Sequence, residues 1–167
     1  STTSQLALGD ALSIALMKKK KFGKFDFKKF HPSGNLGNKL KTAGDIMLVK
    51  NKIPFVNENE IMKNALKILN DKKLGFLVVI NNQGLNAGVF TDGDLKRIMQ
   101  KKRKIDNLKI KLFMTKKPYT VEENTLATEV LSLMNKKKIT NVCVYKKNNK
   151  KKTIGILHIH NLLSLLK

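Results

Sequence analysis

The sequence predicts a mixed α/β (α+β) fold in which one small unit occurs twice, after a helical N-terminal segment. Two stretches, "DIMLVKNKIPFVNEN" at residues 45–59 and "LFMTKKPYTVEEN" at residues 112–124, both run from a methionine through a proline turn to an apolar residue and an acidic segment. Each is followed by an amphipathic helical pattern that ends in lysines, and then by a short run typical of a strand. The repeated order is therefore strand, helix, strand, strand, helix.

The first 43 residues differ in kind from the repeat. The apolar spacing in "STTSQLALGDALSIALMKK" predicts a helix with a broad buried face, and the serines before it offer an N-cap. The next stretch, "FDFKKFHPSGNLGNKL", contains His31, a proline and two glycines, which predicts a shaped loop. We therefore assign residues 1–43 to a separate N-terminal part.

The first copy is predicted at residues 44–106. Its helix is "EIMKNALKILNDKK", its strands are "LGFLVVI" and "GVF" around the turn "NNQGLNA", and its last helix is "DLKRIMQ". The second copy, residues 107–167, has "TLATEVLSLMNKKK", then "ITNVCVY" and "GIL" around "KKNNKKKT", and last "NLLSLLK". A copy of roughly 60 residues is too small to bury both faces of its own sheet, so we expect the two copies to pair and to leave clefts between them.

The stretch "GVFTDGDLKR", residues 88–97, turns abruptly polar where a strand meets a helix. A hydroxyl at Thr91 and free N–H groups at the helix start can hold a phosphate, and the carboxylate of Asp94 can accept hydrogen bonds from a ribose. The alternative is structural, since Thr91 or Asp92 can simply cap the helix. Capping and binding are compatible, and the residues alone leave both open.

The second copy departs from this pattern. His158 stands where the first copy has Thr91, and Asn161 stands where it has Asp94. His158 and His160 would share one face of a strand, but a metal site needs further ligands, and the sequence offers none nearby. We expect His158 to contact a phosphate or a carboxylate and Asn161 to bond a hydroxyl, with no metal.

Composition limits the function classes. The net charge is +22, but nearly all of it is lysine spread over helix ends and loops without interleaved aromatics, so we expect no nucleic-acid binding. No apolar run approaches the roughly 20 residues of a membrane span. The single cysteine, Cys143, lies in an apolar run and predicts a buried thiol in a reducing compartment, with the cytoplasm as the default.

The repeat resembles a tandem pair of cystathionine-β-synthase-type (CBS) domains, a Bateman module, over residues 44–167. CBS domains that bind adenine nucleotides often end in Gly-x-x-Ser/Thr-x-x-Asp, and the first copy matches this pattern at Gly88, Thr91 and Asp94. The resemblance implies a nucleotide effector, AMP or ATP, held by these residues with His158 and Asn161 from the second copy. The module needs no cofactor for a reaction of its own.

The N-terminal part resembles the end of the sugar isomerase (SIS) domain of arabinose-5-phosphate isomerases. The residues that carry it are "GDALSIAL" and "FHPSGNLG". Members of that family interconvert D-ribulose 5-phosphate and D-arabinose 5-phosphate for the synthesis of Kdo, a lipopolysaccharide sugar. The resemblance implies an active-site role for His31, a homo-oligomer, and CMP-Kdo as another candidate effector.

The same resemblance shows what this chain lacks. The family's catalytic base is a glutamate earlier in the SIS domain, and this chain has no glutamate before Glu58. The phosphate-binding Ser/Thr loop is also missing. We therefore expect a regulatory C-terminal portion of an isomerase that is inactive by itself, or a truncated homologue with a sensing role. A stand-alone CBS-pair protein that binds adenosine ligands and regulates a partner is the alternative.

Overall fold

The computed structural model describes residues 1–23, 26–27, 30, 37–38, 40–101 and 104–165. It divides into two compact units, Ser1–Leu40 and Lys41–Lys167. The first unit contains the helix α1 (Thr2–Lys19), with Ser1 at its N-cap. The helix is present as predicted, but its predicted buried face is wrong for this chain, because none of its residues is buried. Its large apolar side chains are all exposed: Leu6, Leu8, Leu12, Ile14, Leu16 and Met17.

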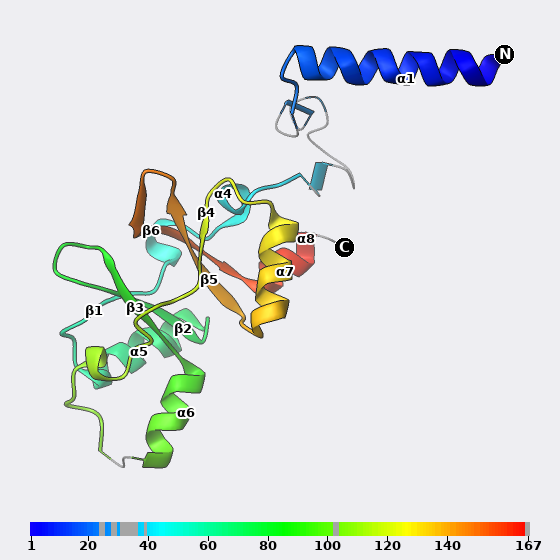
Figure 1. Cartoon of the computed structure of the whole chain (residues 1–167). Coiled ribbons are helices and arrows are strands. Elements are labelled where there is room, and N and C mark those ends of the chain that lie inside the picture. Colours follow the sequence, from blue (N-terminus) through cyan, green and yellow to red (C-terminus); the bar gives the residue numbers. More distant parts are fainter. Residues whose placement is uncertain (24–25, 28–29, 31–36, 39, 102–103, 166–167) are drawn as a thin grey trace. The chain divides into compact units, whose positions relative to one another are not determined.

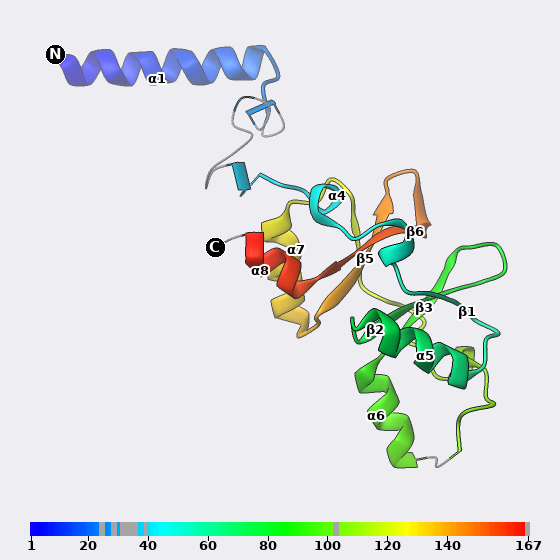
Figure 2. The same ribbon diagram turned by 180° about the vertical axis from the view of Figure 1, so that it is seen from behind.

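The second unit contains the predicted repeat (Figures 1 and 2). After α4 (Ala43–Ile46) and the 3-10 turn η1 (Lys50–Lys52), the first copy runs β1 (Phe55–Asn57), α5 (Met62–Lys72), β2 (Phe76–Ile80), β3 (Asn86–Thr91) and α6 (Asp92–Lys101). The strands form one sheet in the order β1-β2-β3, with β1 and β2 parallel and β2 and β3 antiparallel.

The second copy repeats this order. After the 3-10 turn η2 (Ile110–Leu112) come β4 (Thr120–Glu122), α7 (Ala127–Lys137), β5 (Asn141–Lys146), β6 (Asn149–His158) and α8 (Ile159–Leu165). The sheet order β4-β5-β6 and its strand directions match those of the first copy. The predicted fold of two strand-helix-strand-strand-helix units is confirmed.

One predicted element differs in extent. The turn expected over "KKNNKKKT" is mostly strand, because β6 begins at Asn149 and Lys146 already pairs with Asn149 across a two-residue connection. Register shifts next to Tyr145 take up the extra residues within the ladder. A lysine-rich run carries no apolar alternation, so nothing in its pattern marked it as a strand.

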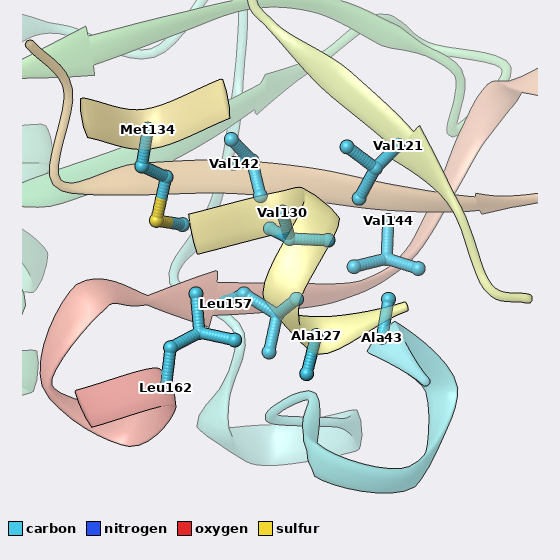
Figure 3. Close-up of a cluster of buried hydrophobic side chains, with 9 residues drawn as sticks. All are labelled: Ala43, Val121, Ala127, Val130, Met134, Val142, Val144, Leu157 and Leu162. Atoms are coloured by element: carbon cyan, nitrogen blue, oxygen red, sulfur yellow. The ribbon is translucent and has the colours of Figure 1, made fainter. Parts of the chain in front are cut away.

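Each copy has its own apolar core. The α5 helix places buried residues at helical spacing toward its sheet. The first core consists of Val56, Met62, Ala65, Leu69, Leu77, Val79, Phe90, Ile105 and Ile110. The second, shown in Figure 3, consists of Ala43, Val121, Ala127, Val130, Met134, Val142, Val144, Leu157 and Leu162.

A third cluster joins the two copies. It contains Ile53, Phe76, Val78, Val89, Cys143 and Ile156. A hydrogen bond also joins the copies: the side-chain amide of Asn86 donates to Thr153 Oγ1 at 2.8 Å. The prediction that the two halves fold against each other is therefore confirmed within the second unit.

The segment leading into each copy packs against the other copy. Leu48 and Ile156 exchange two backbone hydrogen bonds of 2.8 and 3.1 Å, and Ala43 lies in the core of the second copy (Figure 3). In the same way, Thr115 exchanges two backbone hydrogen bonds of 2.8 and 3.0 Å with Val89 of the first copy. The two copies are thus interlocked through their lead-in segments and do not simply lie face to face.

Burial raises the pKa of the Cys143 thiol to about 12, against hydrogen bonds with Thr153 and Asn86 that lower it. The thiolate is the reactive form, so we expect iodoacetamide to alkylate Cys143 in the folded chain at least about 100-fold more slowly than in the urea-unfolded chain at about pH 8. Mass spectrometry of timed samples measures both rates. Equal rates in the two states would show that the thiol is not buried between the copies.

Candidate functional site

One cleft of about 640 Å³ opens where the two copies meet. The first copy contributes the start of β2, the end of β3 and the first turns of α6. The second copy contributes the segment before β4, the turn between α7 and β5, and the end of β6. The lining residues with polar or charged side chains are Lys73, Thr91, Asp92, Asp94, Arg97, Thr115, Lys117, Tyr119, Lys138, Thr140, Asn141 and His158. This volume lies in the usual range for a small-molecule site.

Thr91 and Asp94 form a reciprocal cap at the start of α6. Asp94 Oδ2 accepts hydrogen bonds from the Thr91 N–H at 2.9 Å and from the Thr91 hydroxyl at 2.8 Å. The Asp94 N–H in turn donates to Thr91 Oγ1 at 3.2 Å. This is the capping-box arrangement, and it satisfies two N–H groups that the helix leaves without partners. The structural alternative considered for these residues is thus realised, on the wall of the cleft.

Arg97 also bonds the carboxylate of this cap, by donating a hydrogen bond from Nη2 to Asp94 Oδ1. The arginine side chain is 67% exposed, whereas that of Asp94 is only 9% exposed. A carboxylate has about four acceptor positions, and three on Asp94 are taken by Thr91 and Arg97. One position on Oδ1 remains for a ligand hydroxyl.

Asp92 sits against Gly75, the residue just before β2. Its N–H donates to the Gly75 carbonyl at 3.2 Å. Gly75 has a φ of +60°, and a Cβ there would lie 2.6 Å from Asp92 Oδ2. The left-handed backbone therefore favours glycine at this position, and a side chain there would also push the Asp92 carboxylate aside.

His158 lies at the end of β6, on the cleft wall. Burial lowers its pKa below the ordinary 6.5, and the neighbouring charge of His160 lowers it further. The two rings are 4.9 Å apart between centroids, and His158 Nδ1 accepts a hydrogen bond from the His160 N–H at 3.2 Å. His158 is therefore neutral near pH 7.

We expect the NMR titration of His158 to have its midpoint below pH 6.5, and the His160→Ala variant to move it partway back because burial remains. The folded pKa is the lower one, so this residue's contribution to stability is present above pH 6.5 and is lost as the pH falls through the folded pKa. A midpoint at or above 6.5 in the unmodified chain would contradict the partly buried position.

Asn141 is the least satisfied polar group on the wall. It is 8% exposed, and its side-chain amide donates to Thr140 Oγ1 at 3.1 Å. Its Oδ1 is buried without a hydrogen-bond partner in the described part of the chain. Buried acceptors are nearly always paired, so this oxygen is an exception on the wall of the cleft.

The structure brings three of the five predicted binding residues together and leaves two elsewhere. Thr91, Asp94 and His158 line the cleft. Gly88 does not, because it lies inside β3, where its α-carbon packs against the Thr115 carbonyl and Met114. Asn161 is in α8 beyond the cleft lining, and His31 lies outside the described residues.

Sequence reasoning missed the basic residues and the amide of the site. Lys73 and Lys138 occupy matching positions in the two copies, as the left-handed C-caps of α5 and α7, and both line the cleft. Their equivalence was readable from the repeat, but in a chain with 34 lysines and arginines no single lysine stands out. At the position of Asn141, the first copy has an apolar residue, Phe76. This difference between the copies was the sequence signal that could have identified Asn141 as a site residue.

Among the described residues, no helix is both long and apolar enough to cross a lipid bilayer. Within the same ranges, no three side chains of the metal-binding types His, Cys, Asp and Glu gather into a group that could hold a metal ion.

Comparison with known proteins identifies the repeat. The family model for the CBS domain matches residues 43–101 and 109–167. The arabinose 5-phosphate isomerase KdsD of Escherichia coli K12 is 38% identical over 164 residues, which is 98% of this chain and 49% of that protein. Its counterpart in Francisella tularensis is 38% identical over 166 residues, which is 99% of this chain and 50% of that protein. This chain spans about half the length of the curated relatives that it matches.

Solved structures agree with the family. The structure of CBSX2 in complex with AMP is 26% identical, with a TM-score of 0.62 over 74% of this chain and 94% of that one. The CBS domain pair of MJ0100, in complex with 5′-methylthioadenosine and S-adenosyl-L-methionine, is 23% identical with a TM-score of 0.65 over 75% of this chain and 95% of that one, which supports the fold alone. The chain therefore belongs to the CBS domain family and contains a tandem CBS pair.

Proposed function

We propose that this chain is the regulatory portion of an arabinose-5-phosphate isomerase, and that its CBS pair senses an adenine nucleotide in the cleft between the two copies. The observation that carries the proposal is the convergence of Thr91, Asp94 and His158 from both copies on one cleft of about 640 Å³. The similarity to the isomerases along nearly the whole chain supports the identity of the regulated enzyme. The AMP complex of a CBS pair supports the class of ligand.

The cleft offers a site for each part of a nucleotide. Tyr119 is 45% exposed on the rim beside Pro118, and an aromatic face suits the stacking of a base. Asp94 retains one acceptor position for a ribose hydroxyl. Asn141 Oδ1 can accept a hydrogen bond from an exocyclic amine or a hydroxyl. The basic side chains of the lining suit a phosphate.

We propose the isomerase activity for the whole enzyme, because this chain spans only about half the length of its relatives. Conversion of a ketose phosphate into an aldose phosphate moves a proton between neighbouring carbons and requires a positioned base. His31 is our candidate for a contribution from this chain to that active site. The exposed apolar helix α1 suits burial in a larger catalytic domain, since a helix that is apolar on all sides is typically a core helix. The enzyme is proposed to be a cytoplasmic homo-oligomer.

A thermal-shift panel tests the sensing proposal. The chain is mixed with AMP, ATP, CMP and CMP-Kdo in turn, and a ligand at about 100 times its Kd adds about 2.7 kcal/mol to the free energy of unfolding. We expect AMP and ATP to raise the Tm. A shift with CMP-Kdo alone would replace the adenine nucleotide by a nucleotide sugar, and no shift with any compound would contradict the sensing role. An isomerase assay of the full-length gene product, with and without the stabilising compound, tests the regulatory link separately.

A further inference from the structure

The hairpin between β5 and β6 carries a dense group of lysines at its tip. Five of the seven residues from 146 to 152 are lysines, the other two are asparagines, and all seven are exposed. No acidic residue occurs anywhere from residue 130 to residue 167. Within the described ranges, none of these five lysines takes part in an ion pair. The hairpin tip therefore concentrates positive charge that no bonded carboxylate neutralises.

Three of these lysines bulge out of the strand ladder. Tyr145 pairs with Thr153, and the next residue of β5, Lys146, pairs with Asn149. The three residues of β6 between these two pairs, residues 150–152, are all lysines and have no partner on β5. A bulge bends a strand and re-aims its side chains, and bulges recur beside functional sites. This one holds three like charges side by side, which costs electrostatic free energy.

The first copy shows that the fold does not require this bulge. In its matching hairpin Ile80 pairs with Asn86, and the stretch between them, residues 81–85, has no charged side chain. Both copies share the irregularity one step further in, where β3 passes over Ala87 and β6 passes over Ile154. The lysine bulge is thus added to a hairpin that closes without it, so the packing of the two copies does not explain it.

A second basic segment lies next to the hairpin. Leu48 forms an antiparallel bridge with Ile156 of β6, so the chain after Leu48 continues beside β6 toward the bulge. It forms η1, whose Lys50 and Lys52 are exposed, and both views place this turn beside the hairpin (Figures 1 and 2). Residues 46–57 contain no acidic residue. We call the combined surface the lysine face, formed by Lys50, Lys52, Lys146, Lys147, Lys150, Lys151 and Lys152.

The composition of the hairpin tip favours one class of partner. Lysine is depleted in protein–protein interfaces, which depend on apolar and aromatic side chains, and the tip has neither. Recognition of nucleic-acid bases depends on arginine forks and aromatic stacking, which are also absent from the tip. Clustered lysines are sufficient, as point charges, to bind the closely spaced phosphate groups of an anionic lipid bilayer. A tip without apolar side chains suits contact with the headgroups alone.

We propose that the lysine face docks this chain on an anionic lipid surface, through attraction to the phosphate headgroups and without insertion into the bilayer. The structural alternative is protection of β6, an edge strand of its sheet, because lysines at sheet edges prevent strand pairing between chains. The lysine face lies outside the cleft lining, so docking does not depend on the proposed nucleotide sensing.

Vesicle flotation of the 167-residue chain tests the docking, with vesicles of phosphatidylcholine alone and of phosphatidylcholine and phosphatidylglycerol in equal parts. Each lysine near an anionic surface strengthens binding by roughly fivefold. We therefore expect the combined variant Lys150→Gln, Lys151→Gln and Lys152→Gln to weaken binding to the anionic vesicles by roughly 100-fold. Binding of the unmodified chain should fall as the salt concentration rises, because salt screens the attraction.

Two further variants separate the lysine face from other effects. Lys63→Gln, Lys67→Gln and Lys109→Gln together remove three exposed charges from the first copy, and should change vesicle binding by less than about threefold. Deletion of residues 150 and 151 shortens the hairpin to the length found in the first copy. This deletion variant should keep its fold, as followed by circular dichroism, and weaken vesicle binding by roughly 30-fold.

The outcomes decide between the proposal and its alternatives. Equal weakening by the first-copy variant would assign the binding to net charge, and equal binding to phosphatidylcholine alone would assign it to the exposed apolar helix α1, so either result overturns the lysine face. Unchanged vesicle binding in both hairpin variants, with self-association of the glutamine variant, would show that the lysines only protect the edge. Hairpin-dependent binding of a DNA duplex, without binding of anionic vesicles, would replace the lipid surface by a nucleic acid and overturn the proposal.

Discussion

Gly88→Ala is expected to destabilise the CBS pair by about 2–3 kcal/mol, because an added methyl group has no space where the two copies interlock. An ideal Cβ at Gly88 would lie 2.6 Å from the Thr115 carbonyl oxygen and 3.0 Å from Met114 Sδ. The Thr115 carbonyl cannot move aside cheaply, since it accepts the Val89 N–H at 3.0 Å. Urea unfolding followed by circular dichroism measures the change.

Second variants make this prediction specific. Met114→Ala should not rescue Gly88→Ala, because the closest atom belongs to the backbone. At the matching glycine, Gly155, the three atoms nearest to the added Cβ all belong to the Met47 side chain, with Sδ at 2.3 Å, so Met47→Ala should restore part of the stability lost in Gly155→Ala. Gly9→Ala, in open space on α1, should not destabilise the chain. Unchanged unfolding of Gly88→Ala would show that the lead-in segment does not pack as described.

Asp94→Ala is expected to weaken AMP binding by at least about tenfold and to cost about 1–2 kcal/mol of stability. The affinity falls because the variant removes the acceptor proposed for the ribose. The stability falls because the cap of the helix is lost. Calorimetric titration with AMP and urea unfolding measure the two effects separately.

The chain contains a matched control for this variant. Thr42 and Asp45 form a second capping box at the start of α4, in which Asp45 Oδ2 accepts from the Thr42 N–H at 2.6 Å and from its hydroxyl at 2.8 Å. Asp45 does not line the cleft. Asp45→Ala should therefore lose stability through the same loss of a cap and bind AMP as the unmodified chain does. Similar affinities in Asp45→Ala and Asp94→Ala would reduce Asp94 to a helix cap.

The repeated pattern was sufficient to predict the two copies, because helix and strand periodicities depend on local side-chain spacing. The same spacing carries no information on which copy a lead-in segment contacts. The packing of Ala43 into the second core, and of Thr115 beside Val89, depends on backbone hydrogen bonds between segments far apart in the sequence. That part of the fold could be learned only from the structure.

The candidate site was predictable to a similar extent. Thr91, Asp94 and His158 stand where a strand ends, and such ends gather at one edge of paired sheets. The pattern did not reveal that Thr91 and Asp94 would use their hydrogen bonds on each other. Gly88 belongs to the same sequence motif, yet it serves packing, since its backbone lies against the Thr115 carbonyl and Met114.

Backbone amide mapping by NMR during titration with AMP tests the central claim most directly, namely that one nucleotide site is shared by both copies. The account predicts saturable shifts in the amides of Gly93 and Asp94 in the first copy and of Asn141 and His158 in the second, with a common Kd. Shifts confined to one copy, or located away from these residues, would contradict it.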